Sequence, residues 1–287
     1  MRSYCFSNVT TSFESYQKII NLYQNNRYCS FDRIQVSFKK WFAANMCSAV
    51  GGVLDKLRAD FNEIEFNEID NKIKQVFQKN DFLSHYGFPK ISDENNTTIK
   101  YHKFKQNDRS YFNQYVAKDL ITISDFPEMN QTMRKRVVQT ISELFINSVI
   151  HSESEHIYTC GQFFPQKEKI EFTITDTGVG FKNNINRRFN SKMSSTQAIK
   201  WAMVDGNSTK KDISGGIGLA FFGEFIKANK GKLQIISDDG FFMIDSDIPT
   251  IKQFDKPFPG TIVNMKIRTN DQNIYYLDNN EDRGTLF

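Results

Sequence analysis

Three polar residues at helical spacing are the first feature of this sequence that could do chemistry. Glu143, Asn147 and His151 fall at i, i+4 and i+8, so a helix would place them in one stripe. The residues between them are mostly apolar, which predicts a buried helix: Ile141, Leu144, Phe145, Ile146, Val149 and Ile150. A buried carboxylate needs a cation, a donor or a ligand, because leaving it unpaired costs several kcal/mol. The stripe is therefore either an internal hydrogen-bonded cluster or part of a binding site.

A second candidate site follows a predicted strand. Residues 170–175 alternate between apolar and polar side chains and run directly into Asp176-Thr177-Gly178-Val179-Gly180. Asp176 would lie at the end of this strand, beside space that Gly178 and Gly180 leave open, because glycine lets the backbone turn sharply and another group approach closely. Asp-Thr-Gly is also an ordinary turn sequence, so this motif alone does not separate a site from a turn.

A third candidate is the glycine cluster Gly215-Gly216-Ile217-Gly218-Leu219, which precedes a helix predicted over 220–229. Glycines at a helix N-terminus expose backbone N–H groups and the positive end of the helix dipole, which together favour phosphate binding. Tight packing between a loop and a helix needs the same residues. The preceding segment, 182–214, is polar and basic with one amphipathic piece over 195–204, and so long a connection predicts a lid or binding loop.

The first 125 residues predict a small α/β domain in which strands and helices alternate. The expected helices cover 12–24, 42–57 and 71–82, and the expected strands cover 34–38, 63–66 and 97–104. Pro127 marks the boundary to a second domain over 126–270, whose first helix is expected over 128–152.

The end of the second domain predicts a β-hairpin and a final strand. Residues 232–237 and 241–245 flank Asp238-Asp239-Gly240, a typical hairpin turn, and the last strand is expected over 261–267. The Asn- and Asp-rich tail from Asn270, which includes 271–287, is expected to be solvated.

Whole-chain composition narrows the function classes. The 287 residues carry 37 basic and 33 acidic side chains, a net charge of +4 that is too small and too mixed to indicate nucleic-acid binding. No apolar run approaches the length of a membrane span and the N-terminus lacks a signal-peptide pattern, so we expect a cytoplasmic protein. The four cysteines are widely scattered, which favours neither a zinc site nor a disulfide framework.

Taken together, four short motifs occur in a characteristic order. They are Glu143-x-x-x-Asn147, Asp176-x-Gly178-x-Gly180, Gly216-x-Gly218-Leu219 and Gly260-Thr261. Over about 128–268 this order resembles the GHKL ATPase superfamily, which includes gyrase-type topoisomerases, MutL, heat-shock chaperones and histidine kinases. The resemblance implies a Bergerat-type α/β sandwich, with a mixed sheet covered by helices, beside the smaller N-terminal α/β domain.

The resemblance also implies the cofactors, ATP and Mg²⁺, and the roles of individual residues. Asn147 would ligate Mg²⁺, a hard cation that suits an amide oxygen. Asp176 would accept a hydrogen bond from the adenine amino group, with Thr261 supporting it. Gly178 and Gly180 would leave room for the base.

The phosphates would lie at the third motif. The resemblance implies that Gly216 and Gly218 cradle them beneath the lid and that the adjacent Leu219 belongs to the same site.

The reaction depends on Glu143. In GHKL members that hydrolyse ATP or phosphorylate serine, a glutamate four residues before the Mg²⁺ asparagine acts as general base. Sensor histidine kinases typically have Asn there, and none of the four histidines of this chain is followed by an acidic residue. A histidine kinase-like catalytic domain without its own phosphoacceptor is therefore the less favoured reading. His151 would either touch phosphate or Glu143, or be a satisfied core histidine.

The segment Asn147-Ser148-Val149-Ile150-His151 resembles the anti-sigma-factor serine kinases, which phosphorylate STAS-domain partners. The N-terminal half is itself loosely similar to STAS-like domains at Gln35-Val36-Ser37-Phe38 and the residues after it. We therefore expect an ATPase or a protein serine/threonine kinase in signalling, with a protein partner or a second copy of the chain, and no nucleic acid or membrane. The alternative is a non-catalytic module in which ATP orders residues 182–214 for recognition by a partner.

Overall fold

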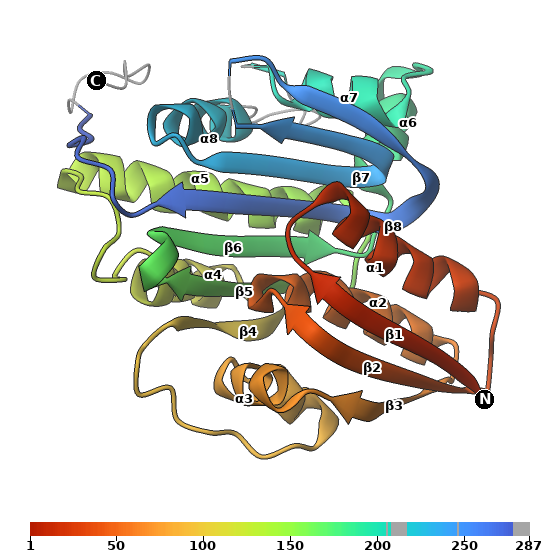
Figure 1. Cartoon of the computed structure of the whole chain (residues 1–287). Helices are drawn as coiled ribbons and strands as arrows, with labels where there is room; N and C mark the ends of the chain where they lie inside the picture. The colour runs from red at the N-terminus through yellow and green to blue at the C-terminus, as the bar shows by residue number, and fades with distance from the viewer. Residues whose placement is uncertain (205, 208–216, 246, 278–287) are drawn as a thin grey trace.

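The computed structural model describes residues 1–204, 206–207, 217–245 and 247–277, and it contains two β-sheets. The smaller sheet is parallel with the order β1-β2-β3, and the larger sheet has five strands with the order β4-β5-β6-β8-β7. Figure 1 shows the larger sheet between two layers of helices, with the smaller sheet beside it. The chain is therefore an α/β protein, as its sequence predicts.

The N-terminal unit, residues 1–97, contains the parallel sheet and its helices. The strands are β1 (Arg2–Val9), β2 (Arg33–Phe42) and β3 (Glu63–Ile69). The helices are α1 (Phe13–Asn26), α2 (Cys47–Ala59) and α3 (Asn71–Lys79), with short helical turns η1 (Ala44–Met46) and η2 (Leu83–Tyr86). Parallel pairing follows from the connections, because a helix lies between each strand and the next. The prediction missed β1 and began the second helix too early, since β2 continues to Phe42.

The five-stranded sheet is antiparallel at every pairing. It contains β4 (Thr98–Lys105), β5 (His156–Phe164), β6 (Lys169–Asp176), β7 (Lys232–Ile244) and β8 (Thr250–Arg268). A mixed sheet was expected, but short connections join β5 to β6 and β7 to β8, and short connections pair strands antiparallel. Because β4 pairs with β5, the change from the smaller sheet to the larger one precedes Thr98.

The remaining helices belong to the five-stranded sheet. They are α4 (Arg109–Tyr115), α5 (Gln131–His151), α6 (Gly180–Phe189), α7 (Ser195–Ala202) and α8 (Ile217–Ala228), with short turns η3 (Val116–Leu120) and η4 (Pro165–Lys167). The long helix predicted over 128–152 is confirmed as α5, which begins after Asn130, whose side chain accepts the Met133 N–H at 2.8 Å. One apolar core joins α5 and α8 to one face of the sheet.

The hairpin predicted at Asp238-Asp239-Gly240 is a bend within a longer pair of strands. Residues 232–237 pair with 261–266 of β8, and residues 240–243 pair with 250–253. The register shifts at Asp238, whose φ is +55°, and the 3.3 Å ion pair between Lys232 and Asp245 brings the two ends of β7 together. Figure 1 shows both strands curling back at this point. The two halves of β7 therefore pair with β8 and not with each other.

The start of the predicted tail is packed against the fold. Tyr275 and Leu277 are 5% and 7% exposed, and the Asn130 side chain hydrogen-bonds to both the carbonyl and the N–H of Leu277. The expectation of a solvated tail from Asn270 is therefore wrong for these residues. Residues 278–287 lie outside the described part of the chain.

None of the helices in the described residues combines the length and apolar character needed to cross a membrane.

The N-terminal unit covers the second face of the five-stranded sheet, and a buried polar network lies in this contact. Asn45 of η1 donates to Thr173 Oγ1 of β6 and to Asn264 Oδ1 of β8, both at 2.9 Å. Asn264 donates to Gln234 Oε1, which also accepts from the Tyr16 hydroxyl of α1. Buried polar groups must be paired in this way because an unpaired one costs about 1–3 kcal/mol.

Removing the centre of this network should destabilise the protein. We expect Asn45→Ala to lower the free energy of unfolding by about 1–3 kcal/mol, because the Thr173 and Asn264 side chains lose a buried donor. Urea denaturation followed by circular dichroism measures this. Asn25→Ala, at an exposed position of α1, is the matched control and should change stability by less than about 0.5 kcal/mol. Equal stability of the two variants would show that the network does not hold the units together.

Candidate functional site

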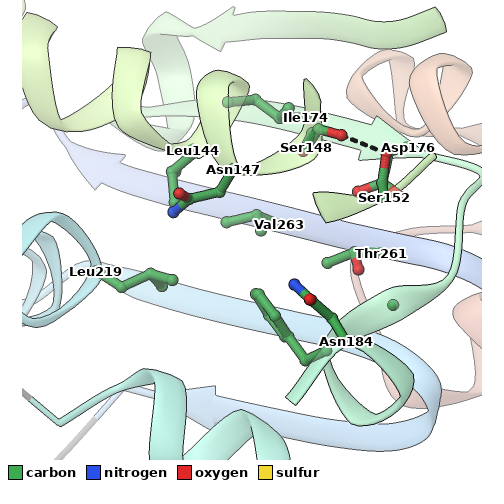
Figure 2. A pocket seen from close by; sticks show the side chains of 12 residues that line it. Leu144, Asn147, Ser148, Ser152, Ile174, Asp176, Asn184, Leu219, Thr261 and Val263 are labelled. Carbon is green, nitrogen blue, oxygen red and sulfur yellow. Dashed lines mark hydrogen bonds between the residues drawn. The ribbon is translucent and has the colours of Figure 1, made fainter. Parts of the chain in front are cut away.

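A pocket lies between α5, the end of β6, the middle of β8, and the first turns of α6 and α8 (Figure 2). The space between its side chains is about 450 Å³, including the part open to solvent. Its lining is mainly apolar with a few polar groups, the usual composition of a small-molecule site. The lining residues are Leu144, Asn147, Ser148, Ser152, Ile174, Asp176, Gly180, Phe181, Asn184, Leu219, Thr261 and Val263.

Asp176 is the buried charged group of this pocket. It is the last residue of β6 and only 3% of its surface is exposed. Its Oδ1 accepts the Gly178 N–H at 3.0 Å, and its carboxyl also accepts from the Ser148 hydroxyl and the Thr261 backbone N–H. Figure 2 shows the Ser148 bond reaching across from α5 to the end of β6. Each of these donors favours the ionised carboxylate.

Burial outweighs these donors. Loss of hydration raises the pKa of Asp176 from 3.8 to about 6, although the Gly178 and Thr261 N–H groups, the Ser148 hydroxyl and the positive charge of Lys56 all lower it. Asp176 is thus ionised near neutral pH but takes up a proton in mild acid. A buried carboxylate of this kind is a strong acceptor for a ligand N–H group.

The glycines after Asp176 are required by close packing. A Cβ on Gly178 would lie 1.7 Å from the Ser152 carbonyl oxygen at the end of α5. Gly180 has φ = +72° and approaches Ser237 Oγ, where a Cβ would lie 2.8 Å away. Gly180 also lines the pocket, whereas Gly178 fixes the loop against α5. The loop therefore holds Asp176 in place from both sides.

Asn147 enters the pocket from α5, and Thr261 and Leu219 enter it from other elements. Figure 2 shows Asn147 opposite Thr261 of β8, with Leu219 at the start of α8. Thr261 pairs with Asp176 in the sheet, and its hydroxyl lies 3.2 Å from Ser237 Oγ. The structure thus brings five of the expected site residues to one pocket, with Asp176 and Gly180 completing the set.

Glu143 lies beside this pocket and against the glycine cluster. A Cβ on Gly218 would lie 2.3 Å from Glu143 Oε2 and 3.2 Å from Glu143 Cβ, so only glycine lets the two helices approach at this point. Glu143 is one turn of α5 before Asn147 and is half-buried. The contact joins two motifs that lie 75 residues apart in the sequence.

Some expected residues lie outside the described part of the chain. These are Gly216 and, within the predicted lid over 182–214, residues 205 and 208–214. The backbone of His151 ends α5, but its side chain is outside the description. The described part of the lid forms α6 and α7. The amphipathic piece predicted over 195–204 corresponds to α7.

Seven lining residues were not predicted as site residues: three from α5 (Leu144, Ser148 and Ser152), two from the sheet (Ile174 and Val263), and Phe181 and Asn184. Ser148 and Ser152 are four residues apart, so they form a second polar stripe beside Glu143 and Asn147. This spacing could have predicted that both serines face the same site as Asn147. Phe181 and Asn184 depend on a helix, α6, that the sequence did not predict.

Metal binding would depend on few protein ligands. In the described residues no three His, Cys, Asp or Glu side chains come together as a metal site. Mg²⁺ is commonly held by one or two protein oxygens together with phosphates and water. Asn147 supplies such an oxygen inside the pocket.

Comparison of the sequence with protein-family models gives no match, and comparison with curated proteins gives none either.

The raised pKa of Asp176 predicts a pH-dependent stability. Because the folded pKa of about 6 exceeds the unfolded value of 3.8, the folded state binds the proton more tightly, and stability falls as pH rises through 6. Relative to Asp176→Asn, which cannot titrate, the wild type should lose up to about 3 kcal/mol between about pH 4 and about pH 7.5.

Urea unfolding at several pH values measures this difference. Asp125→Asn, at an exposed position, is the control and should follow the wild-type pH dependence. A constant difference between the wild type and Asp176→Asn would contradict the assignment of a raised pKa to Asp176.

Proposed function

We propose that this protein binds Mg-ATP through a GHKL-type site and uses it for hydrolysis or for phosphate transfer to a protein serine or threonine. The observation that carries the proposal is that one pocket is lined by both the buried carboxyl of Asp176 and the side chain of Asn147 from α5. The carboxylate suits the exocyclic amino group of adenine, and the amide oxygen suits a metal between phosphates.

The arrangement of elements supports this proposal. The polar helix α5, the strand β6 that ends at Asp176 and the glycine-led helix α8 surround one pocket, in the order that the GHKL resemblance implies. The N-terminus of α8 lies beside the pocket through Leu219, and a helix N-terminus favours phosphate. The parallel sheet of the N-terminal unit supports only a general α/β similarity to STAS-like domains.

Individual residues would act as follows. Asp176 and Thr261 would orient the base, and Asn147 would hold Mg²⁺, which neutralises phosphate charge when bound. Glu143, one turn before Asn147, would accept the proton of a water or a hydroxyl as its oxygen attacks the terminal phosphorus and the bond to the ADP oxygen breaks. In this step the proton of the attacking group goes to Glu143, and ADP leaves with the electron pair of the broken bond.

A non-catalytic nucleotide-sensing module is the second candidate. It is favoured by one observation: the Glu143 carboxylate lies against Gly218 and does not line the pocket. In this case nucleotide would adjust the α6–α7 segment for a protein partner or a second copy of the chain. Incubation with labelled ATP and candidate partners separates the cases, since free phosphate indicates hydrolysis, labelled protein indicates transfer, and neither supports the sensor.

Nucleotide binding should depend on the Asp176 carboxylate. We expect calorimetry to show Mg-ATP binding by the wild type, affinity at least about tenfold weaker in Asp176→Asn, and little binding of GTP, whose base lacks the adenine amino group. Affinity should also weaken as pH falls through about 6, because protonated Asp176 has lost its charge. Asp125→Asn is the control, and equal binding of ATP by all three proteins would refute this site.

Turnover should depend on Glu143. Glu143→Gln should lower phosphate release or transfer by about 10²–10⁴-fold while leaving Mg-ATP affinity within about threefold, because the general base is lost but Asp176 and Asn147 remain. Glu224→Gln, on the exposed side of α8, is the matched control and should keep wild-type turnover. If Glu143→Gln turns over as fast as the control, Glu143 is not the base.

A further inference from the structure

Three residues of α2, spaced four apart, contact the end of β6 and the loop after it. Ser48 Oγ accepts the Thr175 hydroxyl at 3.2 Å, and Lys56 Nζ donates to the Thr177 carbonyl oxygen at 3.2 Å. Between them Gly52 makes room for Thr177, because a Cβ there would lie 2.9 Å from Thr177 Cγ2. The spacing puts all three on one face of α2. This face of α2 therefore contacts the residues immediately before and after Asp176.

Thr177 is also held from the opposite side. Its N–H donates to Ser154 Oγ at 3.2 Å, and its own hydroxyl lies 3.3 Å from the same oxygen. Thr177 links Asp176 to Gly178, whose N–H is a donor to the Asp176 carboxyl. The position of Thr177 therefore sets the direction in which the carboxyl of Asp176 points.

The charge of Lys56 acts on the same carboxyl. Burial raises the pKa of Asp176, and the Gly178 and Thr261 N–H groups, the Ser148 hydroxyl and the positive charge of Lys56 lower it. The neighbouring carboxylate, Asp55, is engaged elsewhere, at 2.7 Å from Lys103 Nζ and 3.0 Å from the Tyr158 hydroxyl. Lys56 thus both anchors the loop and favours an ionised Asp176.

We propose that Lys56, on α2 of the N-terminal unit, is a positioning residue for the pocket, acting through the Thr177 carbonyl on Asp176. The identity of the ligand rests on the proposed function, but the effect on Asp176 does not. Through this contact the N-terminal unit regulates the pocket: a partner that shifts α2 changes how well Asp176 can accept a ligand N–H group. By linkage, a ligand bound to Asp176 stabilises the contact between α2 and the loop by the same free energy.

The test compares Lys56→Met with Lys56→Arg in the full-length chain. NMR titration of the Asp176 carboxyl without nucleotide should give a pKa above the wild-type value of about 6 in Lys56→Met and a value near the wild type in Lys56→Arg. Mg-ATP affinity should fall roughly fivefold to tenfold in Lys56→Met and recover in Lys56→Arg. A merely structural role for Lys56 would not move the titration of Asp176.

Lys18→Met is the matched control, because Lys18 Nζ also donates to a backbone carbonyl of the N-terminal unit, that of Ser7, away from the pocket. Gly52→Ala provides a second route, since its added Cβ pushes on Thr177 and should weaken ATP binding while keeping the Lys56 charge. If Lys56→Met fails to fold, Gly52→Ala and Lys56→Arg still decide the inference. An unchanged Asp176 titration in Lys56→Met overturns it, whereas absence of ATP binding by the wild type overturns the proposed function.

Discussion

Burial of both faces of the five-stranded sheet is the constraint on which the rest of this structure depends. All residues of β6 except the first are buried. Its apolar side chains, among them Phe172, pack under α5 and α8, whereas Glu171, Thr173 and Thr175 hydrogen-bond to the N-terminal unit. Because each polar group on the second face needs a buried partner, the contact between the units has specific geometry and not merely apolar area. The same contact fixes the position of the end of β6, where Asp176 lies.

The N-terminal unit consequently behaves as a structural layer of the larger sheet. Its core is continuous with side chains of that sheet, including Tyr101, Tyr158 and Ile262. Phe13 of α1 stacks on Phe254 of β8 with ring centroids 4.2 Å apart. A unit joined in this way cannot rotate as a rigid body without opening a core, so signals between the units must travel as small shifts of packed helices.

Much of the fold could be predicted from local pattern, and the failures have identifiable physical causes. The capped, apolar helix α5 and the strand before Asp176 were predicted because their periodicity is strong. The alternation in β6 indicates a half-exposed strand, yet Thr173 is fully buried, since polar partners from a distant part of the chain cover it. The bend at Asp238 was taken for a turn because local sequence cannot show that each half of β7 pairs with β8.

In the candidate site, too, local motifs could be predicted, whereas contacts that depend on tertiary packing could not. The residues brought together at the pocket, such as Asn147 and Asp176, were found from the order of short motifs. Gly178 was expected to leave room for a ligand, but its closest neighbour is the Ser152 carbonyl, a contact that depends on tertiary packing. Ser148 was missed because only one polar stripe of α5 was considered. Lys56 could not have been found, because it reaches the site from another unit and lies 121 positions before Thr177 in the sequence.

The hydrogen bond between Tyr16 and Gln234 joins residues 218 positions apart and has a consequence for biosynthesis. On the ribosome, α1 and α2 emerge long before β7 and β8, so the apolar surface that they turn toward the five-stranded sheet stays uncovered until most of the chain has been made. Contacts of such high sequence separation form slowly, and the folding intermediates expose apolar surface that promotes aggregation. The nascent chain should therefore need protection by chaperones until its last strands arrive, and its yield should depend more on folding conditions than on final stability.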